Sequence, residues 1–480
     1  MDKKKIILFG GGALAVLILF VLVAVLALKS LSKPSAEKEK VSFPKEELTL
    51  VFWGFEDPEV YKPFIQRYQA RHKNVKINYV QKTPNADYEK ELMSLLAEGA
   101  GPDIFMVKND WLPRDYKKLS PLPEEAMQSK DFKSKFTPIQ SAEHFEDTFV
   151  PAVSEVCVYE NKVYCLPFSL ETLALIYNPN LFDQARVEYR AKYRDNIDKY
   201  NEIVEQLRRP PKYWDQFEKQ VQLITKKEGN KIIRAGCALG TANNVDWATE
   251  ILTALMLQNK TQMVSTDLKT PTFNLPQKKE TGEEYYPGAD ALHFYTSFAN
   301  PKHKNFSWQK NFKNSIRSFY EGKVAMILGY PSDAIYIKQK NPELKFGVTA
   351  LPQVRGEIGR TDFVKFWATA VNKNSKYPQV AWHFINFIMM YPGNEVRYQL
   401  TVKKPLPFKE LHRVSYLGIS NFEVFSLETK TAKTWYKGIV PDKTELVFTQ
   451  LINNAFKMPI QRALDKAASD LLRYWQSAED

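Results

Sequence analysis

The chain has 480 residues, of which 44% are hydrophobic, 13% aromatic and 25% charged. This balance is that of a globular protein, and it excludes disordered, collagen-like and disulfide-scaffold classes. The formal net charge is +12, but residues 1–47 hold eight Lys against five acids, which leaves +9 spread over the other 433 residues. Because no zinc-finger, RNA-binding or basic-region motif accompanies this diffuse charge, the sequence predicts no nucleic-acid partner.

The N-terminal part of the sequence predicts a membrane anchor. Residues 6–28 form an uncharged run of 23 residues, which as a helix spans roughly 34 Å, enough for a bilayer. Signal peptides have apolar regions of only about 7 to 15 residues. We therefore expect a basic tail at 1–5, an anchor at 6–28 and a polar linker at 29–47. The alternative is a long signal peptide that is cleaved, releasing the mature protein.

The soluble part begins with strands and helices in alternation. Apolar runs predict strands at 48–52, 75–80 and 104–107, and amphipathic patterns predict helices at 58–72 and 88–98. Such alternation favours a parallel sheet covered by helices, with ligands at the carboxyl ends of the strands. The following residues lie at such ends: Trp53, Asn109, Asp110 and Trp111.

The same alternation continues further along the chain. Strands are expected at 173–177 and 235–239, and helices at 214–226, 246–257, 379–390 and within 444–475. Residues 186–209 are dense in Arg, Tyr, Glu and Asp at helical spacing and predict a surface extension. That extension is either a solvated helix with i,i+4 charge pairs or an arm that docks a partner.

Cys157 and Cys165 stand symmetrically about Asn161, which predicts two strands around a short polar turn. Thiols that face each other across such a hairpin are close enough for a disulfide, and an oxidising compartment would form it. The alternative is two half-buried thiols one register apart. The sequence leaves both open.

Most kinds of catalytic chemistry have no signature in this sequence. The six histidines are scattered without metal-ligand spacing, and there is no Cys-x-x-Cys, nucleophile elbow, Walker loop or dinucleotide fingerprint. We therefore predict no metal, no cofactor and no enzymatic activity. The 9 Trp, 24 Tyr and 30 Phe, several of them beside Asp, Asn or Glu, suit a sugar, because aromatic faces stack on C–H groups while polar groups bind hydroxyls.

Four ordered blocks of sequence resemble family 1 extracellular solute-binding proteins of ABC importers. They read ELMSLLAEGAGPDIFMVKNDWLPRDYKKLSP, VYCLPFSLETLALIYNPNLFDQA, PPKYWDQFEK and FYEGKVAMILGYPSDAI. The resemblance implies an α/β, two-lobed clamp of the periplasmic-binding-protein kind that closes on a ligand. It places lobe 1 at 48–167 with 350–402 and lobe 2 at 168–349 with 403–480. The chain would cross between them near 167–172, 348–352 and 402–407.

The same resemblance implies ligand-binding residues. Asp110 and Glu171 match carboxylates that accept sugar hydroxyls, and Asn243 and Asn244 lie where the second lobe contributes a polar or aromatic contact. Aromatic contacts are expected from Trp53, Trp111, Tyr330 and Trp367.

The function predicted from these residues is that of a membrane-anchored, extracytoplasmic binding protein. It would be a monomer that captures a carbohydrate and delivers it to the permease subunits of an ABC importer. The alternatives are a surface glycan-adhesion protein without a transporter, and a binding protein for a peptide, polyamine or organic anion. A glycan-processing enzyme would need paired acids about 5 to 10 Å apart.

Overall fold

A six-stranded sheet forms the centre of the first lobe in the computed structural model, which describes residues 43–479 except 133–135, 230, 280, 411–412, 414 and 417. The strand order is β2 (Val75–Gln81), β1 (Leu48–Gly54), β3 (Ile104–Lys108), β17 (Trp367–Asn372) and β4 (Leu119–Ser120), with β7 (Cys165–Pro167) also paired to β17. β1 runs parallel to β2 and β3, as the alternating pattern predicts. β17 is antiparallel to β3, β4 and β7, and joins them from more than 190 residues further along the chain.

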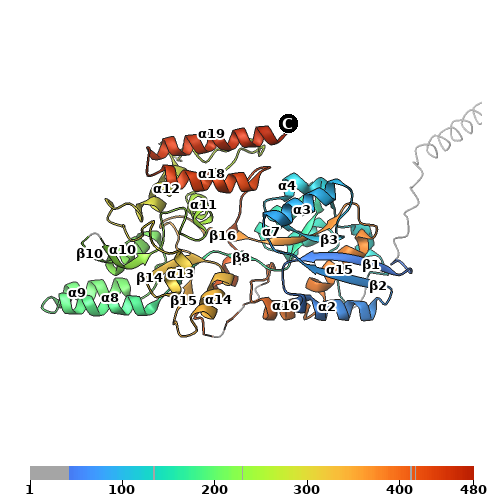
Figure 1. Ribbon diagram of the computed structural model, residues 1–480, viewed down its shortest axis with the longest axis horizontal. Coiled ribbons are helices and arrows are strands. Elements are labelled where there is room, and N and C mark those ends of the chain that lie inside the picture. Colours follow the sequence, from blue (N-terminus) through green and yellow to red (C-terminus); the bar gives the residue numbers. More distant parts are fainter. Residues whose placement is uncertain are drawn as a thin grey trace, which may run out of the picture. The chain divides into compact units, whose positions relative to one another are not determined.

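Helices cover both sides of this sheet. In Figure 1, α2 (Pro58–Arg71) lies below the strands and α3 (Ala86–Ala97) lies above them. α15 (Pro378–Met390) contacts both α2 and β17. α2 begins after Asp57, whose side chain accepts a hydrogen bond from the Glu59 amide, so the first turn is capped. The remaining elements of this lobe are α4 (Leu112–Asp115), a 3₁₀ turn (Tyr116–Lys118), α5 (Glu124–Gln128), α6 (Ala142–Thr148), α7 (Pro151–Cys157), β5 (Val158–Tyr159), β6 (Lys162–Val163) and α16 (Asn394–Val402).

A five-stranded sheet forms the second lobe. Its order is β10 (Lys226–Glu228), β11 (Lys231–Cys237), β14 (Val324–Gly329), β9 (Ala174–Tyr177) and β15 (Gly347–Thr349). Its larger helices are α8 (Pro179–Lys192), α9 (Ile197–Leu207), α10 (Trp214–Ile224), α11 (Ala248–Gln258), α12 (Pro287–Ser297), α14 (Pro331–Lys340), α18 (Pro441–Asn454) and α19 (Ile460–Glu479). The shorter elements are α13 (Ser315–Tyr320), α17 (Val424–Glu428), β12 (Gln277–Lys278) and β13 (Glu284–Tyr285).

A small sheet of β18 (Ala432–Lys433), β16 (Asp362–Lys365) and β8 (Glu171–Thr172) connects the lobes. β8 and β16 are antiparallel, with Val364 opposite Thr172, and Figure 1 shows them between the two larger sheets. β8 lies where the first crossing is predicted.

The other two crossings, expected at 348–352 and 402–407, stay predictions. The Leu351 amide donates to Glu428 of the second lobe, and the chain then passes along β16. Just after residues 402–407, the Lys409 amide donates to the Thr148 carbonyl of the first lobe. These bonds join distant segments, so no local pattern marks the boundaries at 350 and 403.

The helical extension predicted at 186–209 is present as the end of α8 and all of α9, which pack against each other (Figure 1). Exposed ion pairs lie along it, for example Lys199 with Glu202 and Arg208 with Glu205. Surface pairs of this kind contribute little to stability. The extension therefore has the form of a solvated helix pair, and its role as a docking arm stays a prediction.

The basic tail 1–5, the anchor 6–28 and all of the linker before residue 43 lie outside the described residues. Within the part of the chain that is described, no helix combines the length and apolar character that a membrane span needs.

The hairpin predicted around Asn161 exists with a shifted register. Glu160 and Asn161 form the turn, both with positive φ, and Val158 pairs with Val163. Cys157 is therefore opposite Tyr164, whose amide donates to the Cys157 carbonyl. The Cys157 and Cys165 side chains are nevertheless buried together, with their Sγ atoms 2.7 Å apart as free thiols.

Candidate functional site

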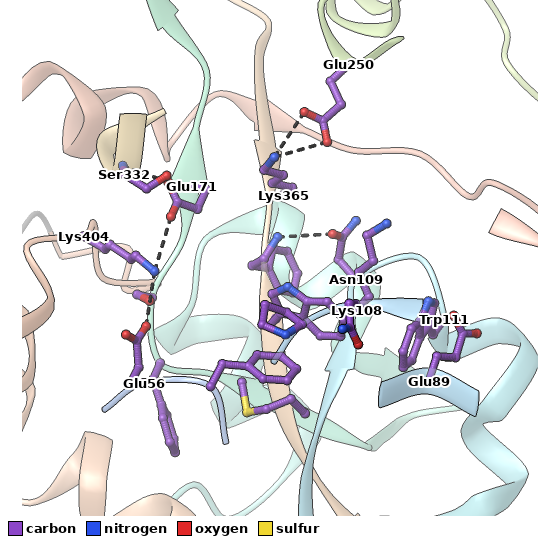
Figure 2. Close-up of a pocket in the computed structure, with 18 of the residues that line it drawn as sticks. Glu56, Glu89, Lys108, Asn109, Trp111, Glu171, Glu250, Ser332, Lys365 and Lys404 are labelled. Carbon is purple, nitrogen blue, oxygen red and sulfur yellow. Dashed lines mark hydrogen bonds and ion pairs between the residues drawn. The ribbon is translucent and has the colours of Figure 1, made fainter. Parts of the chain in front are cut away.

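A cavity of about 720 Å³ lies between the lobes, and both contribute to its walls. This volume is within the usual range for small-molecule sites. The first lobe lines it with residues that follow strand ends or begin helices: Phe55, Glu56, Asn85, Glu89, Lys108, Asn109 and Trp111. The crossing segments contribute Glu171, Lys365, Phe366, Trp367 and Lys404, and the second lobe contributes Trp247, Glu250, Ser332 and Asp442. Figure 2 shows many of these side chains.

The first-lobe wall is aromatic. Trp367 begins β17, and Trp111 and Phe55 both meet its ring edge to face, with centroids 5.3 and 4.7 Å away. This geometry is favourable between aromatic rings and holds each one in a fixed orientation. Trp111 is only 3% exposed, so the other rings hold it in place. The wall offers rigid apolar surface on which a ring-shaped ligand can stack.

Trp247 supplies an aromatic surface from the second lobe. It precedes α11 with φ at +63°, in the left-handed region that non-glycine residues seldom adopt. Its indole nitrogen donates to an Asp333 carboxylate oxygen at 2.7 Å, and its ring meets Tyr330 edge to face. The side chain remains 36% exposed and lines the cavity. A backbone conformation that costs free energy is thus retained where it presents a ring to the cavity.

A shared lysine joins two acids at the crossing between lobes. The Lys404 amine lies 3.2 Å from a Glu56 carboxylate oxygen and 3.3 Å from a Glu171 oxygen, as Figure 2 shows. Ser332 Oγ of α14 also donates to Glu171, at 3.3 Å. Burial disfavours the charged amine, but the two carboxylates outweigh it, so the pKa of Lys404 is raised. Glu171 is thereby oriented at the cavity wall by groups from both lobes.

A second charged cluster lies beneath Trp247. Lys365 of β16 is 3.2 Å from a Glu250 oxygen of α11, and the Tyr330 hydroxyl donates to that carboxylate at 3.0 Å. The Lys365 amine also lies 3.2 Å from the centre of the Trp247 ring, a cation–π contact. Burial lowers the pKa of Lys365 despite Glu250. Burial likewise raises the pKa of Asp333 to about 7.

This raised pKa predicts a pH-dependent stability that Asp333→Asn should remove. The carboxyl of the folded protein keeps its proton up to about pH 7, whereas that of the unfolded chain loses it near pH 4. Its contribution to the free energy of unfolding is therefore fully present at low pH and is lost as the pH rises from about 4 to 7. The loss is up to about 4 kcal/mol. Urea unfolding at pH 4.5, 6 and 8 should show wild type losing stability relative to the variant, whose amide can still accept a hydrogen bond. Parallel pH profiles for the two proteins would contradict this.

Asp110 lies behind the cavity wall. Its carboxylate is 1% exposed and 3.5 Å from the amine of Lys108, which does line the cavity. On its other side it is 3.4 Å from the buried amine of Lys437 in the second lobe. Asp110 therefore neutralises two lysines in this structure and is not among the lining residues.

The structure brings together three of the residues expected to bind ligand, Trp111, Glu171 and Trp367, at the cavity wall. Trp53 is buried beside Lys82, and Tyr330 is buried behind Trp247. Their direct contact with a ligand, like that of Asp110, stays a prediction.

The asparagine pair lies away from the cavity lining. Asn243 is exposed, and Asn244 is buried, where its amide donates to the carbonyls of Gln309 and Phe312 and its oxygen accepts from the Trp308 indole. Asn244 thus holds a loop together. Trp247, three residues later, is the lining residue, and its position after Asn-Asn-Val-Asp at a helix start was the available signal.

Other lining residues had no signal in the sequence. Phe55, Glu56, Lys108, Glu250, Lys365 and Lys404 carry ordinary residue types at ordinary positions. Among the described residues, no group of three His, Cys, Asp or Glu side chains could hold a metal ion.

Comparisons with known proteins agree with this architecture. Two relatives are similar in sequence: a maltotriose-binding protein of Pyrococcus abyssi, 28% identical over 163 residues, and a protein of Brucella abortus named as a binding protein, 22% identical over 328 residues. The first match covers 32% of each chain, and the second covers 67% of this chain and 66% of the relative. The chain thus matches less than two thirds of the length of these relatives.

Solved structures share the fold. The cyclic α-maltosyl-1,6-maltose binding protein of Arthrobacter globiformis aligns with a TM-score of 0.69 at 16% identity, over 90% of this chain and all of that one. The sugar-binding protein MalE of Xanthomonas citri aligns with a TM-score of 0.67 at 18% identity, over 90% and 100% of the two chains. These likenesses establish the two-lobed α/β fold of periplasmic binding proteins.

A family model described as bacterial extracellular solute-binding protein matches residues 54–389, well over half of the chain. Its members bind solutes, which agrees with the prediction that this chain is not an enzyme. The match includes every strand of the two larger sheets except β1, of which it includes only the last residue, and most of the residues that line the cavity. The chain belongs to the family of bacterial extracellular solute-binding proteins.

Proposed function

We propose that this protein captures an uncharged oligosaccharide in the cavity between its lobes and delivers it to the permease subunits of an ABC importer. The observation that carries the proposal is the pairing of Trp111 and Trp367 on one lobe with Trp247 on the other, around a polar cavity. Aromatic faces bind the C–H faces of sugar rings, and two facing walls suit a ligand enclosed between lobes.

The charges of the cavity support an uncharged ligand. Lys404 is paired with Glu56 and Glu171, Lys365 with Glu250, and Lys108 with Asp110. Such pairs offer donors and acceptors to hydroxyl groups, whereas a strongly anionic ligand would meet the surplus of carboxylates. Among the proteins of like fold, one is bound to mannobiose and another is complexed with maltotetraose.

Closure of the lobes supplies the mechanism. The ligand favours the closed arrangement to the extent that its contacts there exceed those in the open one. We infer that Trp367 and Trp247 stack on the sugar while Glu171 orients its hydroxyls. Trp111, which is buried against Trp367, would hold that ring in its orientation. Asp110 would act through Lys108, and Tyr330 would act by supporting Trp247.

The test of the binding class is thermal unfolding of residues 44–480, which form one compact unit, against saccharides, amino acids, peptides and polyamines. A ligand at about 100 times its Kd adds roughly 2.7 kcal/mol of stability. We expect an oligosaccharide to raise the melting temperature. A shift with a peptide or polyamine and with none of the sugars would replace the carbohydrate by another solute.

A second candidate function uses the same cavity without a transporter, as a surface glycan-adhesion protein. Uptake of labelled ligand by cells separates the two, because an importer partner makes accumulation depend on this protein. Surface binding without accumulation would favour adhesion.

The mode of attachment is a further part of the proposal. The 23-residue apolar run at 6–28 and the polar segment at 29–47 support a membrane helix with a tether. The full chain should then sediment with membranes and resist extraction by alkaline carbonate. A shortened product in the medium would instead indicate a cleaved signal peptide.

We also propose that Cys157 and Cys165 form a disulfide in the extracytoplasmic compartment. Thiol–disulfide exchange with the disulfide of an oxidoreductase would form the Cys157–Cys165 bond, whose sulfur atoms are already 2.7 Å apart. The disulfide of the oxidoreductase would take up both electrons and both protons and become two thiols. Burial and the neighbouring Cys165 raise the pKa of Cys157, which slows exchange once the lobe has folded. The chain has three cysteines, so alkylation of the denatured, unreduced protein should label only Cys237. Labelling of all three would contradict the disulfide.

A further inference from the structure

A groove of about 380 Å³ adjoins the main cavity, between α3 of the first lobe and the start of α18 of the second. Ala86, Glu89 and Asp442 line both hollows. The groove is therefore continuous with the cavity and forms an extension of it toward one side of the protein.

The walls of this groove combine apolar and polar groups. Met93 of α3 lines it from the first lobe and Val440 and Pro441 line it from the second, and these supply apolar surface. Lys90, Asp442 and Lys443 are exposed side chains around it. A sugar unit needs this combination, because its ring has apolar C–H faces and its hydroxyls both donate and accept hydrogen bonds.

Arg114, which lines the groove, lies at the boundary between the two hollows, beside Glu89, which lines both. The Arg114 guanidinium lies 5.4 Å from the centre of the Trp111 ring, which lines the main cavity. It donates to Glu89 at 2.9 Å and to the Ile439 carbonyl of the second lobe at 3.4 Å. Asp442 is near enough that its charge adds to the burial that raises the pKa of Glu89. Polar groups of both lobes thus line the route from Trp111 into the groove.

We propose that the groove between α3 and α18 binds the end of an oligosaccharide that is too long for the main cavity. This inference rests on the proposed function and extends it, because it assigns the ligand to linear, uncharged oligosaccharides whose terminal units lie in the groove. Short oligosaccharides would occupy the main cavity alone.

The test is calorimetric titration with two series of probes, α-1,4-gluco-oligosaccharides from maltose to maltoheptaose and β-1,4-manno-oligosaccharides from mannobiose to mannohexaose. In the series that binds, affinity should rise by about tenfold between the short and long members, a gain of about 1.4 kcal/mol. Met93→Trp should fill the groove and remove this gain while leaving the affinity for short members unchanged.

Ser94→Trp is the matched control. Ser94 is the next residue of α3, is exposed and does not line the groove, so this variant should keep the full gain with length. Lys90→Ala with Lys443→Ala removes polar groups at two exposed positions that line only the groove. This double variant should also reduce the gain, and it provides a second measurement should Met93→Trp disturb α3.

The outcomes separate this inference from the proposed function. An affinity that does not depend on length, or a gain with length that both groove variants retain, would overturn the groove as a binding site and leave the cavity intact. No binding by either series would overturn the oligosaccharide assignment itself, and the groove proposal with it.

Discussion

Replacing Trp247 by alanine should weaken binding of the oligosaccharide by about 2 kcal/mol, or roughly thirtyfold in Kd. The indole is partly exposed at the cavity wall, held by its hydrogen bond to Asp333 and by its edge-to-face contact with Tyr330. A ring held in one orientation loses little conformational entropy on binding. The favourable free energy of its contact with the ligand is therefore offset only slightly. Titration calorimetry of the folded variant measures the change directly.

The stability of that variant distinguishes a binding role from a folding role. Trp247 has a left-handed backbone conformation, so Trp247→Gly removes the ring and also relieves the backbone strain. We expect Trp247→Gly to bind as weakly as Trp247→Ala, with a melting temperature no lower than that of Trp247→Ala. Tyr336→Ala is the control, because Tyr336 is 44% exposed on α14 and does not line the cavity. Wild-type affinity in both Trp247 variants would exclude this ring from the site.

Replacing Lys404 by methionine should lower the free energy of unfolding by about 3 kcal/mol, because removing one partner of a buried ion pair leaves uncompensated charge. Here two carboxylates, Glu56 and Glu171, would lose their shared cation. The value is at the lower end of the usual range because the Lys404 side chain is 23% exposed. Urea unfolding at pH 7 measures the loss.

Neutralising the acids should reverse part of this effect. Adding Glu56→Gln and Glu171→Gln to Lys404→Met removes the unpaired negative charges, so the triple variant should be more stable than Lys404→Met alone. Lys62→Met serves as the control, because its pair with Glu59 is exposed and surface pairs contribute little. If Lys404→Met is no less stable than Lys62→Met, the Lys404 cluster does not hold the crossing segments together.

Much of the secondary structure follows from local patterns. The strands expected at 48–52, 75–80 and 104–107 appear as β1, β2 and β3, each extended by one or two residues. The helix expected at 379–390 is α15. The apolar residues of such short segments become buried whichever other segments pack against them. The sequence near each element is therefore enough to predict the element.

The site was predicted less completely, because it depends on which distant groups meet. Glu171 and Trp367 belong to β8 and β17, which reach the cavity through pairing with strands far away in the chain. Asp110 follows a strand end, as expected, but the charge of Lys437 from the other lobe holds it behind the wall. The sequence around a carboxylate does not predict which lysine will pair with it.

The sequence by itself determined the family and the alternation of strands and helices, since these depend on local apolar spacing and on short ordered blocks. Only the tertiary structure decided which side chains line the cavity, and that Trp247 rather than Asn243 or Asn244 lies at the wall. The reason is physical: local hydrophobic patterns form elements, but ion pairs, ring contacts and the insertion of β17 between β3 and β4 form only when distant segments pack together.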